Sequence, residues 1–113
     1  MFGPMPNSFR WPLVVLLATA LAVYLQTITF GFVWDDHLLV VDNRFTGSVQ
    51  GWIQAFTTDL WAASGDPDPS SGYYRPLFVV DLGLTRLMAG LDPGVHHMHG
   101  LAWHLVAIGL AAW

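Results

Sequence analysis

The sequence predicts an all-α membrane protein, and three observations indicate this fold class. Hydrophobic residues make up 54% of the 113-residue chain and charged residues only 11%, with no lysine. This composition is too apolar for an ordinary soluble domain and too poor in charge for disorder. A stretch of 24 residues, Trp11 to Trp34, contains no charged side chain. Two later segments repeat their apolar residues at helical spacing.

Length and charge exclude several classes of protein. At 113 residues the chain makes one domain at most. The net charge is −4, and all eight acidic residues follow Trp34. Nucleic-acid binding is excluded because there is no basic patch to meet a phosphate backbone. The absence of cysteine excludes a disulfide framework and a thiolate metal site.

The first element is a transmembrane helix over residues 11–34, preceded by a cytoplasmic tail over residues 1–10. About 20 apolar residues suffice to cross the hydrocarbon core, and Trp11 and Trp34 mark its ends as in interfacial aromatic belts. A cleaved signal peptide is the alternative, but its apolar run would be short and the run continues beyond the candidate cleavage site. Arg10 favours a cytoplasmic N-terminus, although the other arginines follow the span, so charge alone does not settle the orientation.

Residues 35–94 are predicted to form a loop with two amphipathic helices on the membrane surface. The first, in "SVQGWIQAFTTDLWAA" (48–63), has Ser48 as its N-cap. Before it, residues 37–41 form either a short extended piece or a helical turn. The apolar stripe of the surface helix over residues 48–63 contains Trp52, Ile53, Phe56, Leu60 and Trp61.

The second surface helix follows a loop over residues 64–72 that contains two Asp-Pro pairs. It begins at Pro76 and ends at Gly90, and it carries Asp81 on a face away from its apolar stripe. A second transmembrane helix, cut off part-way, is predicted over residues 95–113. The apolar stripe of the surface helix that begins at Pro76 contains Leu77, Val80, Leu84, Leu87 and Met88.

Two adjacent carboxylates, Asp35 and Asp36, follow the first span directly. Adjacent side chains point in different directions in a helix or a strand, so the two are expected to do different jobs. One hypothesis makes a carboxylate here a general base. Solvation or capping of the helix end is the structural alternative.

Arg75 and the histidines are the other candidate functional residues. Arg75 stands just ahead of a helix start between aromatic and apolar residues, which suits a phosphate partner or a snorkelling surface arginine. His97 and His104 are seven residues apart and share a helix face, while His96 and His99 are i,i+3 neighbours. They are either metal or haem ligands or interfacial histidines.

In their order and spacing, five motifs resemble the N-terminal part of a membrane glycosyltransferase of the GT-C fold. The closest likeness is to the protein O-mannosyltransferases and to the O-mannosyltransferase-like proteins that carry tetratricopeptide repeats (TMTC-like). The resemblance extends from residue 11 to residue 113. The motifs are Trp34-Asp35-Asp36, Asp42-Asn43, Tyr74-Arg75-Pro76-Leu77, Gly90-Leu91-Asp92-Pro93, and His97 with His104.

The resemblance implies an inverting transfer of a mannose-like sugar from a polyprenyl-phosphate donor to a hydroxyl acceptor on a protein or glycan, with protein Ser/Thr favoured. Asp35 would deprotonate the acceptor and Asp36 would order the site. Arg75 would lie near the lipid phosphate, with Tyr74 and His97 as further substrate-binding residues. No metal ligand is assigned, while a divalent metal stays open as a cofactor beside the lipid-linked sugar. The protein would be multi-pass in the inner cell membrane, with the 35–94 loop extracytoplasmic, in the periplasm or lumen.

Two departures from the family pattern matter. Gly100 stands where relatives often have Asn between the two histidines. A GT-C enzyme also needs many spans for its lipid-phosphate pocket, so we expect an N-terminal fragment of a longer enzyme, inactive alone. Two alternatives are a small non-enzymatic membrane protein whose loop binds a partner, and a His-ligated haem or metal subunit.

Overall fold

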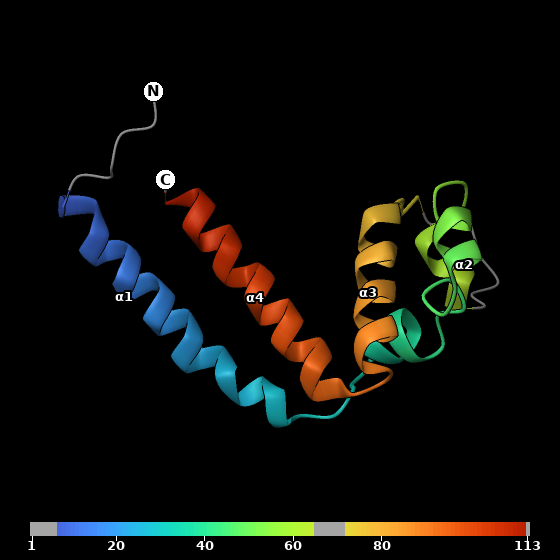
Figure 1. Ribbon diagram of the computed structural model, residues 1–113, viewed down its shortest axis with the longest axis horizontal. Helices are drawn as coiled ribbons and strands as arrows, with labels where there is room; N and C mark the ends of the chain where they lie inside the picture. The colour runs from blue at the N-terminus through green and yellow to red at the C-terminus, as the bar shows by residue number, and fades with distance from the viewer. Residues whose placement is uncertain (1–6, 65–71, 113) are drawn as a thin grey trace.

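The computed structural model describes residues 7–64 and 72–112, and every regular element in this part of the chain is helical (Figure 1). The all-α prediction is therefore confirmed at this level. Much of the predicted tail 1–10 and loop 64–72 lies outside the described residues. The elements are α1 (Asn7–Tyr24), η1 (Leu25–Thr29), η2 (His37–Val41), α2 (Val49–Gln54), η3 (Leu60–Ser64), α3 (Pro76–Ala89) and α4 (Pro93–Ala111).

One stretch in the described residues, Arg10–Thr29, is long and apolar enough to cross a membrane. It combines most of α1 with η1, and only 6% of its most apolar window is buried inside the protein. Such a predominantly apolar, unburied helix is costly in water and stable in hydrocarbon. α4 does not meet the same criterion, since its 19 residues include four histidines. Its crossing of the membrane therefore stays a prediction.

α1 and η1 lie antiparallel to α4, although they are far apart in sequence (Figure 1). Leu13, Leu17 and Ala20 are less exposed than their neighbours on α1 and follow one another at helical spacing. Leu101 is buried on α4. A Cβ on Gly94 would come within 2.9 Å of the Ile28 carbonyl oxygen, so the backbones of η1 and α4 approach closely at this end.

The loop elements pack on α3 around a small apolar core. Gly83 of α3 leaves room for the Trp52 ring, because a Cβ there would fall on the indole. The Trp52 indole N–H donates to the Thr46 carbonyl oxygen at 3.3 Å. The core contains Phe45, Ala55, Leu60, Ala63 and Val79, with Leu39 packed against it.

Arg86 joins α3 to the segment before α2. Its Nη1 donates to the Val40 carbonyl oxygen at 3.0 Å, to Thr46 Oγ1 at 3.0 Å and to the Asn43 carbonyl oxygen at 3.4 Å. Asn43 and Thr46 are both 1% exposed. One guanidinium nitrogen thus ties the Val40 carbonyl oxygen and the Thr46 hydroxyl to α3, and it shares the Asn43 carbonyl oxygen with the Thr46 hydroxyl.

The single surface helix expected over residues 48–63 is wrong in extent. Ser48 does cap α2, with its Oγ accepting from the Gly51 N–H at 3.1 Å, but α2 has only six residues. The Thr57 and Thr58 hydroxyls both donate to the Gln54 carbonyl oxygen, which competes with the helical hydrogen bonds. Asp59 then accepts from the Trp61 N–H at 2.9 Å and starts η3. Earlier, residues 37–41 form the helical alternative, one turn of π-helix.

The bounds predicted for the second surface helix are confirmed. Pro76 lies in the first turn of α3, and Gly90 ends it with a φ of 63°. The predicted apolar stripe faces outward, since Leu77 is 74% exposed and Leu87 and Met88 are each 75% exposed. An outward apolar stripe suits a helix that lies on lipid. Its position at a membrane surface stays a prediction.

Candidate functional site

The acidic pair lies at a tight turn beyond the candidate membrane helix, whose helical structure ends at Thr29 rather than at the predicted Trp34. Trp34 has a φ of 42°, a left-handed conformation that bulky side chains rarely adopt. The Asp36 carboxylate folds back on this turn, where Oδ2 accepts from the Val33 N–H at 3.1 Å. Asp35 is exposed. The two neighbouring carboxylates therefore have different surroundings, one engaged with the backbone and one open to solvent.

His97 lies beside the same turn. Its Nε2 is 3.3 Å from the Gly31 carbonyl oxygen, and its ring centroid is 6.2 Å from that of Phe32. The structure thus brings His97 close to the segment that carries Asp35 and Asp36. Seven residues later on α4, the His104 ring packs edge-to-face with the Tyr24 ring, and the two ring centroids are 5.2 Å apart.

The shared face predicted for His97 and His104 is confirmed. Both line a pocket of about 260 Å³ between η1 and α4. Asn at position 100 would add an amide here, but Gly100 leaves the wall without a side chain. The remaining lining residues are Tyr24, Thr27 and Leu101.

Tyr74 and Arg75 lie elsewhere, at the N-terminal end of α3. The Tyr74 hydroxyl donates to the Phe56 carbonyl oxygen at 2.8 Å, and the exposed Arg75 guanidinium lies 5.6 Å from the Tyr73 ring centroid. The 14 residues of α3 span about 21 Å between this end and the turn into α4. The predicted site residues therefore form two groups in this chain, one at each end of α3.

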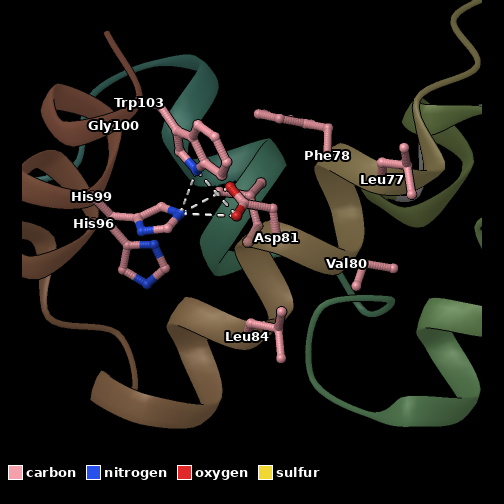
Figure 2. A pocket seen from close by; sticks show the side chains of 10 residues that line it. Leu77, Phe78, Val80, Asp81, Leu84, His96, His99, Gly100 and Trp103 are labelled. Atoms are coloured by element: carbon pink, nitrogen blue, oxygen red, sulfur yellow. Dashed lines mark hydrogen bonds and ion pairs between the residues drawn. The ribbon is translucent and has the colours of Figure 1, made fainter. Parts of the chain in front are cut away.

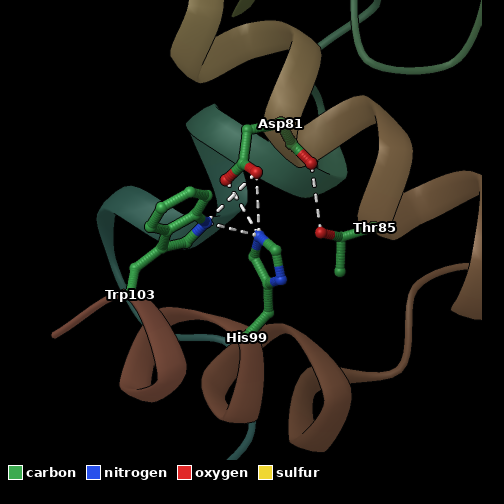
Figure 3. A network of polar contacts seen from close by, with 4 residues as sticks. All are labelled: Asp81, Thr85, His99 and Trp103. Carbon is green, nitrogen blue, oxygen red and sulfur yellow. Dashed lines mark hydrogen bonds and ion pairs between the residues drawn. The ribbon is translucent and has the colours of Figure 1, made fainter. Parts of the chain in front are cut away.

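A polar network that the sequence reasoning missed links α3 to α4 (Figures 2 and 3). His99 Nε2 lies 2.9 Å and 3.0 Å from the two carboxylate oxygens of Asp81. The Trp103 indole N–H donates to Asp81 Oδ1 at 3.2 Å. The Thr85 hydroxyl donates to the Asp81 carbonyl oxygen at 3.1 Å, and so bonds only within α3.

This network closes one side of a groove of about 550 Å³ between α3 and α4 (Figure 2). A site of this volume is within the usual range for small molecules. His96 is also part of the lining and is only 8% exposed. The apolar lining residues are Leu77, Phe78, Val80, Leu82 and Leu84.

Part of this network was readable in the sequence. Asp81 was placed off the apolar stripe, and His99 and Trp103 are four apart on a helix, hence neighbours. Nothing local linked Asp81 to His99, which lie 18 positions apart on different helices. Within residues 7–64 and 72–112 no three His, Asp or Glu side chains form a metal-binding cluster.

Together these features define a class: in the described residues, a helical protein with one candidate membrane helix, an acidic turn beyond that helix, and a mainly apolar groove with one polar side between α3 and α4. Comparison with known proteins is more specific. The chain is 32% identical over 80% of its length to protein O-mannosyl-transferase Tmtc2 of Drosophila melanogaster. It is 29% identical over 86% of its length to protein O-mannosyl-transferase TMTC2 of Homo sapiens, and 27% identical over 90% to the human TMTC3.

The chain is thus a homologue of the TMTC-type protein O-mannosyl-transferases, as its motifs predicted. The matched segments cover 10%, 12% and 11% of these three relatives, respectively. No protein-family model matches the chain. No solved structure matches it either.

Proposed function

We propose that this chain is the N-terminal part of an integral-membrane glycosyltransferase that moves a mannose-like sugar from a polyprenyl-phosphate donor to a hydroxyl group, with protein Ser/Thr as the favoured acceptor. The observation that carries this proposal is the homology to proteins named protein O-mannosyl-transferases. Residues 1–10 would be cytoplasmic and residues 11–34 and 95–113 would cross the inner cell membrane. The 35–94 loop would then be extracytoplasmic.

Asp35 is the proposed base. An exposed carboxylate six residues beyond the end of the candidate membrane helix can meet an acceptor from the aqueous side and a lipid-linked donor from the membrane side. Asp35 would take the proton of the acceptor hydroxyl while its oxygen attacks the anomeric carbon. The bond from that carbon to the phosphate oxygen breaks on the opposite face, and the lipid phosphate leaves with the electron pair. One displacement of this kind inverts the anomeric configuration.

Asp36 would hold the turn that presents Asp35. Its carboxylate accepts from the Val33 N–H, which fixes the backbone immediately before the base. His97, whose Nε2 lies 3.3 Å from the Gly31 carbonyl oxygen near the same turn, would bind the sugar.

Arg75 would neutralise the leaving phosphate, with Tyr74 next to it. This role requires a movement of α3, because α3 separates Arg75 by about 21 Å from its junction with α4. Distance measurements between spin labels at the exposed positions 77 and 38, which leave Arg75 and Asp35 in place, would show a shortening with donor lipid if the assignment holds. An unchanged distance in the presence of saturating donor would overturn the role of Arg75.

The decisive experiment compares Asp35→Asn and Asp36→Asn in the full-length protein from the natural gene, reconstituted in lipid. Loss of the base should lower sugar transfer by at least about 100-fold. Asp36→Asn keeps an oxygen that can accept from Val33, so transfer should fall only a few-fold. Normal transfer by Asp35→Asn would contradict the mechanism. Absence of transfer by the unaltered protein, with a loop that still binds a partner, would favour the non-enzymatic alternative.

A further inference from the structure

The geometry points to the groove between α3 and α4 as a binding site for a neutral amphiphile, a molecule with a hydrocarbon body and a hydroxyl-bearing head. The groove has about 550 Å³ of space, with Leu77, Phe78, Val80 and Leu84 on its apolar wall (Figure 2). Asp81, His96, His99 and Trp103 form its polar side. This site is separate from Asp35 and does not depend on the proposed sugar transfer.

His96 presents an unpaired acceptor to this groove. Its Nε2 lies 3.1 Å from the Gly90 carbonyl oxygen. A carbonyl oxygen only accepts, so Nε2 carries the hydrogen, and Nδ1 of the neutral ring has a lone pair. Nδ1 is buried and has no hydrogen-bond partner, and Figure 2 shows this edge of the ring turned toward the groove. A buried acceptor without a donor is destabilising, so the site favours a ligand that supplies an O–H or N–H group.

Asp81 and His99 are acceptors toward the groove as well. The His99 N–H and the Trp103 N–H converge on the Asp81 carboxylate, which brings Trp103 Nε1 to 3.0 Å from His99 Nε2. With its hydrogen on Nε2, His99 has its lone pair on Nδ1. The polar side of the groove therefore selects donors. It also disfavours phosphates, whose oxygens need donors, because the N–H groups of His96, His99 and Trp103 are already engaged by Gly90 and Asp81.

The rest of the groove selects a neutral, partly apolar molecule. Its aliphatic and aromatic wall removes water from whatever binds, which penalises a cation that is not tightly paired. The Asp81 charge is already engaged by two N–H groups, so little of it remains for an ammonium group. Hydroxyl groups on a hydrocarbon body satisfy both sides of the groove. A sugar-bearing lipid and a glycerolipid share this chemistry.

The test uses the complete chain in lipid nanodiscs with 15N-labelled histidines. Decyl mannoside should saturably shift the His96 Nδ1 resonance toward that of a hydrogen-bonded acceptor. Monodecanoylglycerol, which stands for a glycerolipid, is the second probe. If only one of the two probes binds, its head group identifies the kind of lipid that the groove takes. Decyl phosphate, with the same tail and a charged head, should bind at least about tenfold more weakly. Equal binding of decyl phosphate, or no saturable shift with either hydroxylated probe, would overturn the proposal.

A matched pair of variants isolates the acceptor. His96→Gln keeps an N–H for the Gly90 carbonyl oxygen but has no atom at the Nδ1 position, so the Kd for the better probe should rise about tenfold. His104→Gln is the same exchange on the α4 face toward α1, and the Kd should not change. Equal affinities of the two variants would contradict the proposal. Thermal unfolding in the same nanodiscs checks that both variants are folded, and the His96 shift in the unaltered chain is independent of either variant.

Discussion

His99 Nε2 lies 2.9 Å from Asp81 Oδ2 and joins α4 to α3 across 18 positions of the sequence. Both side chains are 29% exposed, so water screens the contact only in part. One turn further along α4, Trp103 donates to the same carboxylate. The crossing of the two helices is therefore held by a polar contact whose geometry fixes one side of the groove.

Asp81→Ala should loosen this crossing. His99 and Trp103 would lose their shared acceptor, and the expected loss in free energy of unfolding is about 1 kcal/mol, discounted for partial exposure. Thermal unfolding followed by circular dichroism measures it. Asp42→Ala removes an exposed carboxylate and should leave the midpoint within error. Equal midpoints for the two variants would mean that the contact does not stabilise the crossing.

Gly83→Ala should destabilise the packing of α3 on the loop. The new Cβ would fall on the Trp52 ring, which would have to move and give up its hydrogen bond to Thr46. Overpacking of this kind costs about 1–3 kcal/mol. Gly109→Ala is the control, since nothing lies within 4 Å of its Cβ position, and alanine should stabilise the helix by about 0.5–1 kcal/mol. The prediction fails if Gly83→Ala unfolds at the same temperature as Gly109→Ala.

Arg86→Gln should release the segment between residues 40 and 46 from α3. It removes a donor that reaches three acceptors, at an expected cost of about 2 kcal/mol. Arg86→Lys keeps the charge but not the planar geometry and should recover only part of that loss. Hydrogen exchange of the amides in this segment is the readout. Arg75→Gln, at an exposed guanidinium, should leave their protection unchanged, and equal protection in Arg86→Gln would refute the anchoring role.

The antiparallel pairing of α1 with α4 can be checked with cysteines, because the chain has none of its own. Tyr24 and His104 have ring centroids 5.2 Å apart. Paired substitutions Tyr24→Cys and His104→Cys should therefore be cross-linked by a short bis-maleimide, as followed by proteolysis and gel mobility. Tyr24→Cys with Trp103→Cys places the second thiol on the face toward α3 and should react much more slowly. Similar rates for both pairs would argue against this packing.

Local features were predictable because they depend on a few consecutive residues. The Ser48 cap, the Pro76 start and the Gly90 end of α3 all lie where the sequence predicted them. The break between α2 and η3 was missed, although its signal was present. The two threonine hydroxyls compete for the Gln54 carbonyl oxygen, and the apolar periodicity over residues 48–63 concealed that competition.

By itself the sequence determined the helical class, the candidate membrane helix and the resemblance to O-mannosyltransferases, since composition, periodicity and motif order are properties of the chain. Only the tertiary structure decided that Asp81 meets His99, that Arg86 reaches Val40, and that the stripe on α3 faces outward. These contacts join residues 18 and 46 positions apart. Such pairings depend on which helix faces pack together, and that choice is made by the summed packing of all elements rather than by any one stretch.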